Sequence, residues 1–308
     1  MINSYINYLK IYLFFVGIFL ALITVLNWTV DPYNEIGNNR IGLYCSCERQ
    51  AKNKIVSFPH NAILIGSSKT NKVNPDDLCK YKFYNASFRG STPEEMFFYL
   101  KKYAIKEKLV VIGLDFYMFN ERQYPLANIN KWSTHSFSIH EYLLSYNVFR
   151  DSLTSIGKWF LSVPTMIKEN GQINTYYKDR ENEVFNDFVY NKWIQGLKND
   201  IYHDFVFSKA RMDYLKRTKI MLESRNIKHI VFINPLNKDV YSVLQALDSF
   251  RIFVEWKNEL KNIFRDLKDL SYGEYSAKEL FYNNDPFHYK PDTGRTFINS
   301  LLGCEGVN

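Results

Sequence analysis

The pattern of apolar residues opens with one long uninterrupted run near the N-terminus. Residues 11–30 read IYLFFVGIFLALITVLNWTV and contain no charged side chain. A helix of this length, at ~1.5 Å per residue, crosses the ~30 Å hydrocarbon core of a bilayer. Trp28 lies where an interfacial aromatic anchor belongs, and residues 27–32 offer no small-residue site for a signal peptidase. The pattern therefore predicts an uncleaved transmembrane anchor at 11–30, after a short tail at 1–10.

The charges around this anchor do not decide its orientation. Lys10 and the terminal amine precede it, and four basic residues follow at some distance: Arg40, Arg49, Lys52 and Lys54. The rule that cytoplasmic flanks are richer in Lys and Arg therefore gives almost no information about the orientation of the anchor. A large domain that follows a single N-terminal anchor is most often exported. We expect a single-pass membrane protein with a membrane-proximal segment at 31–60 and its main domain on the periplasmic or extracellular side.

Beyond the anchor, short apolar runs alternate with stretches of helical periodicity. The apolar runs predict buried strands, and the amphipathic repeats predict helices between them. The predicted strands are residues 62–66, 81–86, 108–113 and 229–234, and the predicted helices begin near Asn74 and Thr92 or cover 209–224 and 252–267. This alternation favours the α/β class, with a mostly parallel sheet covered by helices on both faces.

The alternation of predicted strands and helices is lost between Tyr117 and Tyr202. This segment is rich in Asn, Tyr, Ser and charged residues, and it is too long to be one loop in a compact domain. We interpret residues 61–303 as one α/β domain with an insertion or lid at about 117–202. The alternative is a set of ordinary helices, such as one within 140–160.

Composition is that of an ordinary globular protein. Of the 308 residues, 46% are hydrophobic and 23% charged. The 17% aromatic content is high and fits either a carbohydrate-binding surface or AT-rich coding. The net charge of +7 arises from 39 basic residues interleaved with 32 acidic ones, without a long basic run. We therefore expect no nucleic-acid partner.

The cysteines and histidines favour disulfides over metal binding. Cys45 and Cys47 are too close in sequence to pair easily with each other. One or two disulfides become plausible if the domain is exported, and the sequence leaves the pairing open among the four cysteines, which also include Cys79 and Cys304. The histidines show no H-E-x-x-H pattern or other zinc spacing. We expect no metal and no cofactor.

Two short segments at opposite ends of the α/β pattern offer the residues of a serine nucleophile system. The run from Ala62 ends in Gly66-Ser67-Ser68, and Asp285-Pro286-Phe287-His288 lies near the C-terminus. A serine hydroxyl needs an imidazole to take its proton and a carboxylate to hold that imidazole in the right tautomer. Ser68, His288 and Asp285 can fill these roles if the fold unites them.

The order of these segments resembles the SGNH (GDSL-type) hydrolase superfamily. The resemblance lies in Gly66-Ser67-Ser68, in Asn85 and Gly90 after the second strand, in Gly113-Leu114-Asp115 after the third, and in Asp285-x-x-His288. The anchor and Asp31-Pro32-Tyr33-Asn34 look like the membrane-anchored bacterial branch, which includes the D-alanyl transfer protein of teichoic acid synthesis and alginate-type O-acetylation proteins. The likeness covers residues 9–120 and 205–300. It implies a flavodoxin-like three-layer fold.

The resemblance also implies a role for each site residue. Ser68 would be the nucleophile and His288 the general base, while Asp285, in the same irregular loop, would orient the imidazole. The oxyanion hole would comprise the backbone N–H groups of Ser68 and Gly90, helped by the Asn85 side chain.

Asp115 departs from the superfamily's pattern, which usually has an Asn oxyanion donor at that place. A carboxylate would repel the oxyanion, so Asp115 must point away, be protonated, or mark weakened esterase chemistry. Loss of one donor costs ~3 kcal/mol of transition-state stabilisation.

These expectations describe a membrane-anchored serine esterase or O-acyltransferase that acts on acyl esters of a cell-envelope polysaccharide. The substrate would be an acylated glycan or glycolipid, and the resemblance allows a membrane acyltransferase as partner. Hydrolase and transferase use the same acyl-serine intermediate, so the sequence does not separate them. The alternative is a non-catalytic SGNH-like scaffold that binds glycan or an assembly partner, suggested by Asp115 and the aromatic content.

Overall fold

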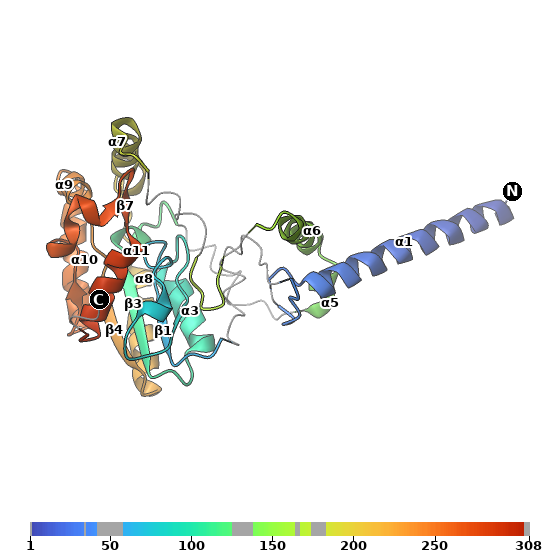
Figure 1. Ribbon diagram of the computed structural model, residues 1–308, viewed down its shortest axis with the longest axis horizontal. Coiled ribbons are helices and arrows are strands. Elements are labelled where there is room, and N and C mark those ends of the chain that lie inside the picture. The colour runs from blue at the N-terminus through green and yellow to red at the C-terminus, as the bar shows by residue number, and fades with distance from the viewer. Residues whose placement is uncertain are drawn as a thin grey trace. The chain divides into compact units, whose positions relative to one another are not determined.

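The computed structural model describes residues 2–33, 35–41, 58–124, 138–163, 167–173 and 183–304 (Figure 1). The chain divides into two compact units. One comprises Met1–Ile55 and His135–Ile167, and the other comprises Val56–Thr134 and Lys168–Asn308. Cys45 and Cys47 lie outside the described residues.

The described part of the first unit contains the N-terminal helix and two helices from the middle of the chain. These are α1 (Ile2–Val30), α5 (Ile139–Leu143) and α6 (Tyr146–Phe160). Within α1, residues Tyr5–Val30 are long and apolar enough to cross a membrane. Asp31 ends this helix with a φ of 41°. Its carboxylate accepts hydrogen bonds from three following backbone N–H groups and, at 2.7 Å, from the Tyr142 hydroxyl.

The second unit is built on a five-stranded parallel sheet with the order β2-β1-β3-β4-β5. The order reverses between β1 and β3, as in doubly wound sheets. A separate antiparallel hairpin, β6–β7, follows the sheet in sequence. The strands are β1 (Ala62–Ile65), β2 (Phe83–Asn85), β3 (Leu109–Leu114), β4 (Lys228–Ile233), β5 (Lys268–Asp269), β6 (Phe281–Tyr282) and β7 (Asp285–Tyr289).

Helices connect these strands and cover both faces of the sheet (Figure 1). Among the described residues of this unit, the α-helices are α3 (Pro93–Tyr103), α7 (Asp187–Gly196), α8 (Lys209–Ser224), α9 (Lys238–Gln245), α10 (Ser249–Ile263) and α11 (Pro291–Leu301). Short helical turns are η2 (Pro75–Asp77), η3 (Phe116–Phe119), η5 (Leu197–Ile201, a π-helix), η6 (Glu274–Ser276) and η7 (Lys278–Leu280).

The two faces of the sheet pack against different helices. Ala62 and Leu64 of β1 belong to a buried cluster with Phe297 of α11. Alternate residues of a strand point to opposite faces, and the right-handed crossover rule places α3, α8 and α10 together on the other face. Contacts of α8 with both α3 and α10 agree with this placement. The predicted α/β class, with a parallel sheet flanked by helices, is confirmed.

Local sequence explains where several of these elements begin and end. The Thr92 backbone N–H donates to the Glu95 carboxylate at 3.1 Å, which closes the capping arrangement that the sequence predicts for α3. The predicted helix at 209–224 coincides with α8.

The C-terminal region departs from the sequence prediction. Asp285 and His288 lie in strand β7 and not in an irregular loop. The reason is tertiary, because β7 becomes a strand only by pairing with the two-residue β6, with a register shift at Phe281 and Tyr282.

The middle of the chain, residues 117–202, is divided between the two units. The described part of the first unit takes α5 and α6 from it, whereas α7 belongs to the sheet-containing unit and contacts β7.

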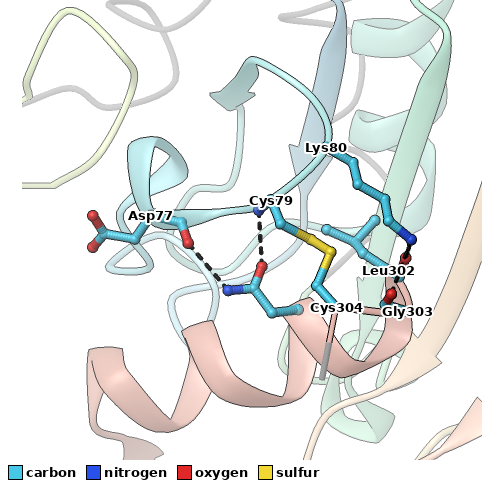
Figure 2. The surroundings of a disulfide bond; sticks show 7 residues. Asp77, Cys79, Lys80, Leu302, Gly303 and Cys304 are labelled. Atoms are coloured by element: carbon cyan, nitrogen blue, oxygen red, sulfur yellow. Dashed lines mark hydrogen bonds between the residues drawn. A yellow bond between two sulfur atoms is a disulfide. The ribbon is translucent and has the colours of Figure 1, made fainter. Parts of the chain in front are cut away.

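A disulfide joins the turn after η2 to the end of α11 (Figure 2). It links Cys79 to Cys304 across 225 positions of sequence, with the two Cα atoms 6.6 Å apart. The Asn299 side chain bonds the same turn, accepting from the Cys79 N–H at 3.0 Å and donating to the Asp77 carbonyl at 3.1 Å. A disulfide typically stabilises a fold by about 2–4 kcal/mol and persists in oxidising compartments.

Candidate active site

The sheet brings the ends of its central strands to one edge. Ser67 and Ser68 follow β1, Asp115 follows β3 and Asn234 follows β4, so all lie at the carboxyl ends of parallel strands. In open α/β sheets, ligands bind outside this edge, where the strand order reverses. Here the reversal falls between β1 and β3.

The turn after β1 requires glycine at its first position. A Cβ at Gly66 would lie 2.3 Å from the Thr70 Oγ1 and 3.0 Å from the Gly113 carbonyl oxygen. Gly113 is equally confined, because a Cβ there would lie 2.8 Å from the Phe232 ring. These two glycines let β1 and β3 pack closely under the turn that carries Ser68.

The tertiary fold unites the three residues of the expected catalytic triad. Ser68 Oγ lies 2.9 Å from His288 Nε2, and His288 Nδ1 lies 2.8 Å from Asp285 Oδ2. The other Asp285 oxygen, Oδ1, accepts the backbone N–H groups of Phe287 and His288 at 3.1 and 3.2 Å. These bonds hold the carboxylate in place, so the network assigns the proton to Nδ1 and leaves Nε2 to accept the serine proton.

The environment of His288 favours the neutral imidazole. Burial lowers the pKa of His288 from its usual value to about 4, the nearby charges of Lys72 and Lys69 act in the same direction, and Asp285 opposes them. Only a neutral imidazole can accept the Ser68 proton. His288 is therefore available as a base throughout the neutral range.

Replacing Lys72 by Met should raise the pKa of His288, because removal of a neighbouring cation favours the protonated imidazole. The rate of Ser68 modification by a fluorophosphonate, measured against pH, should fall on the acid side with a midpoint near 4 in the wild type. In Lys72→Met this midpoint should move to higher pH, whereas Lys72→Arg keeps the charge and should leave it in place. An unchanged or lower midpoint in Lys72→Met would contradict the assigned role of the charge.

Asp115 points into the protein, beneath the nucleophile turn. Its Oδ2 accepts hydrogen bonds from Ser67 Oγ at 2.6 Å and from Asn234 Nδ2 at 3.0 Å. Its Oδ1 lies 3.1 Å from Lys69 Nζ, and both side chains of this ion pair are almost fully buried. The carboxylate thus supports the turn through Ser67, and Lys69 balances its charge. Of the three possibilities that the sequence leaves for Asp115, this geometry corresponds to a carboxylate that points away from the oxyanion.

The same network reaches the histidine strand. The Tyr289 hydroxyl donates to Asn234 Oδ1 at 3.0 Å, and Asn234 in turn donates to Asp115. The turn with the nucleophile and the strand with the base are therefore joined by buried polar contacts as well as by the Ser68–His288 bond.

Asn85 is placed differently from the sequence prediction. Its Nδ2 donates to the Thr70 and Val73 carbonyls, both at 2.9 Å, and its Oδ1 accepts the Ser87 N–H at 3.0 Å. Both amide hydrogens are thus used by the backbone. The side chain braces the segment after the nucleophile and has no hydrogen to offer an oxyanion, which corrects the expected role.

Two backbone groups were predicted as oxyanion donors. Within the described residues, the Ser68 N–H donates to no protein acceptor, so it can serve a substrate oxygen. Gly90 adopts a φ of 60° in the loop after β2. A Cβ at this position would approach the Tyr124 ring to 3.2 Å. The role of the Gly90 backbone N–H as an oxyanion donor stays a prediction.

Sequence reasoning missed two aromatic residues beside the triad. Burial raises the pKa of the Tyr117 hydroxyl well above its usual value, the charge of Asp115 acts in the same direction, and the neighbouring Ser67 and Ser68 side chains oppose them. The Tyr117 hydroxyl therefore stays protonated in the neutral range. Trp193 of α7 meets the His288 ring edge to face, with 6.5 Å between ring centroids. Both lie where the α/β pattern is lost, so no periodicity pointed to them.

Within the described ranges, no three His, Cys, Asp or Glu side chains are grouped so that they could hold a metal ion. No protein-family model matches the chain, and no curated protein matches it as a relative.

Proposed function

We propose that this chain is a membrane-anchored serine esterase or O-acyltransferase of the SGNH type, acting on acyl esters of a cell-envelope polysaccharide. The observation that carries the proposal is the continuous hydrogen-bonded chain from Ser68 through His288 to Asp285. In the proposed reaction, Ser68 Oγ attacks the ester carbonyl while His288 Nε2 takes its proton. The imidazolium then returns the proton to the departing alkoxide, which leaves an acyl-serine. Water or a sugar hydroxyl attacks this intermediate in the second half.

Oxyanion stabilisation in this proposal comes from the Ser68 backbone N–H and the Tyr117 hydroxyl, with Gly90 as a further backbone donor. Tyr117 supplies a donor in the region where the Asn of the resembled superfamily is replaced by Asp115. The charge of Asp115 is balanced by Lys69, which weakens one of the two reasons for favouring a non-catalytic scaffold.

Two further features support the proposed location. The helix Tyr5–Val30 supports membrane attachment, and the Cys79–Cys304 disulfide supports an exported domain, since such bonds persist outside the reducing cytosol. A glycan or glycolipid at the outer face of the membrane is then the substrate class within reach, and a membrane acyltransferase is a suitable partner.

The proposal predicts covalent labelling of one serine. A fluorophosphonate probe should modify the purified full-length protein, and Ser68→Ala should abolish the modification, because the probe needs an activated hydroxyl. Gel fluorescence and peptide mass mapping measure this. Ser300→Ala, an exposed serine on α11, is the matched control and should label like the wild type. Equal labelling of wild type and Ser68→Ala would sink the assignment, and glycan binding that survives loss of all three triad residues would favour the scaffold.

A further inference from the structure

Helix α6 has a solvent-exposed apolar face that nothing in the proposed enzyme chemistry uses. Its members recur at helical spacing on one side of the helix, and we call them the apolar stripe: Tyr146, Phe149, Leu153, Ile156 and Phe160. Tyr146 and Phe160 are each 74% exposed and Leu153 is 49% exposed. Leu161, immediately after the helix, is 78% exposed. Exposed contiguous apolar residues of this kind mark an interaction surface.

A different face of α6 docks onto the end of α1 through polar contacts. Asn27 of α1 is fully buried. Its Nδ2 donates to the Leu143 carbonyl at 2.8 Å, and its Oδ1 accepts the Ser152 hydroxyl at 3.0 Å. The Tyr33 hydroxyl, just beyond α1, donates to Asp151. The bonds to Ser152 and Asp151 attach α6 to the last turn of α1 and to the residues that follow it, and the bond to Leu143 attaches the end of α5 at the same place.

The position of Asn27 along α1 sets the depth of α6. At ~1.5 Å per residue, Asn27 lies about 25 Å from Lys10, and a hydrocarbon core is ~30 Å thick. If the bilayer begins at Lys10, Asn27 lies within one turn of the opposite boundary. If it begins at Tyr5, the apolar segment's first residue, Asn27 lies just outside that boundary. With either placement of the bilayer, the contacts to Asn27 hold α6 at the membrane surface. Helix α6 contacts α1 and crosses it instead of running along it (Figure 1).

The order of contacts around α6 shows which way the stripe faces. Side chains rotate by about 100° per residue, so Asp151, Ser152 and then the stripe follow one another around the helix. Asp151 contacts Tyr33, beyond the end of α1, whereas Ser152 contacts Asn27, one turn inside α1. Continuing in the same direction, the stripe turns away from Tyr33 and out from the surface of α1, toward the side on which the membrane-spanning part of α1 lies. The part-exposed Lys158 and the exposed Thr154 lie on the opposite, polar side, and the exposed Arg150 lies at the edge of that side.

We propose that α6 is an interfacial helix whose apolar stripe inserts among lipid acyl chains at the membrane surface. The proposal rests on α1 spanning the membrane and is independent of the triad chemistry. Amphipathic helices with Trp, Phe and Leu on one face and basic residues on the other bind membranes in this way. Trp159, beside the stripe and 53% exposed, suits the headgroup level. The consequence is that the anchor unit has two membrane contacts, which restrict its rotation and tilt at the surface.

The test uses the full-length protein in vesicles of phosphatidylcholine and phosphatidylglycerol. Cys45 and Cys47 are replaced by Ser, and the Cys79–Cys304 disulfide leaves no other thiol to react. A single cysteine is placed by Leu153→Cys in the stripe or by Thr154→Cys on the polar face, and each is labelled with the environment-sensitive fluorophore NBD. We expect a blue-shifted emission at position 153 and a several-fold greater loss of fluorescence than at 154 when shallow doxyl-labelled lipid is included.

Leu20→Cys, in the exposed middle of α1, reports on the anchor itself, and its quenching is measured with lipid whose doxyl group lies deep in the acyl chain. If NBD at position 20 is quenched by lipid and NBD at positions 153 and 154 is quenched equally, the proposal of an interfacial helix is overturned and the membrane anchor is not. Absence of quenching at 20 overturns the membrane anchor and the interfacial helix together, while leaving the Ser68 labelling unaffected. A blue shift at 153 without lipid quenching, or one that grows with the protein-to-lipid ratio, assigns the stripe to a protein surface or a second copy and also overturns the proposal. Phe160→Cys with Asn147→Cys repeats the comparison at a second pair of positions.

Discussion

Replacing Asp285 by Asn should lower the rate of Ser68 modification by roughly 10⁴-fold. The Asn oxygen can keep the bonds from the Phe287 and His288 backbone N–H groups, so the strand should retain its shape. Its amide group would then face His288 Nδ1, at the place now occupied by Oδ2. An amide donor there forces Nδ1 to accept and moves the imidazole proton to Nε2. A protonated Nε2 cannot take the serine proton.

The second-order rate of fluorophosphonate labelling measures this effect in the full-length protein. Asp292→Asn, an exposed position at the start of α11, serves as the matched control and should react at the wild-type rate. An Asp285→Asn rate within a few-fold of the wild type would show that Asp285 does not set the tautomer, and would leave His288 and Ser68 as a two-residue system.

Replacing Lys69 by Met should lower the free energy of unfolding by about 3–5 kcal/mol, because the change leaves the Asp115 carboxylate buried without its cation. Both hydrogen bonds to Asp115 go to one oxygen, Oδ2. An Asn at position 115 can therefore keep them while removing the charge. The double variant Lys69→Met with Asp115→Asn should recover much of the lost stability.

Urea unfolding of the detergent-solubilised protein, followed by intrinsic fluorescence, measures these differences as a double-mutant cycle. Lys216→Gln breaks an exposed ion pair with Asp213 and should cost less than about 1 kcal/mol. Additive effects of the two core substitutions would contradict a direct Lys69–Asp115 coupling. They would also reopen the question of what holds Ser67 beneath the nucleophile.

Local sequence accounts for the elements whose signals lie within a few residues. The strand at 62–65 is a continuous apolar run, and α3 begins at a Thr-Pro-Glu-Glu segment whose capping contact is present. The helix at 209–224 follows from its own periodicity. Strand β7 was missed because its strand character depends on pairing with β6, and α7 was missed because Asn and aromatic residues mask its periodicity.

The candidate triad was named from the sequence because its residue types and their order carry information. The supporting contacts could not be named in the same way. Lys69, Asn234 and Tyr289 reach Asp115 or its network from three different segments. Asn85 was assigned to the oxyanion hole, yet its amide hydrogens are used by two backbone carbonyls that lie 12 and 15 residues away in sequence.

The sequence by itself determined the apolar anchor segment, the α/β alternation and the identity of Ser68, His288 and Asp285 as candidates, since each depends on residue type and short-range spacing. Only the tertiary structure decided that Ser68 and His288, 220 positions apart, lie 2.9 Å from each other. It also decided that Asp115 is neutralised by Lys69. The physical reason is that parallel strands collect residues from distant segments at one edge of the sheet, where burial makes each charge depend on its neighbours.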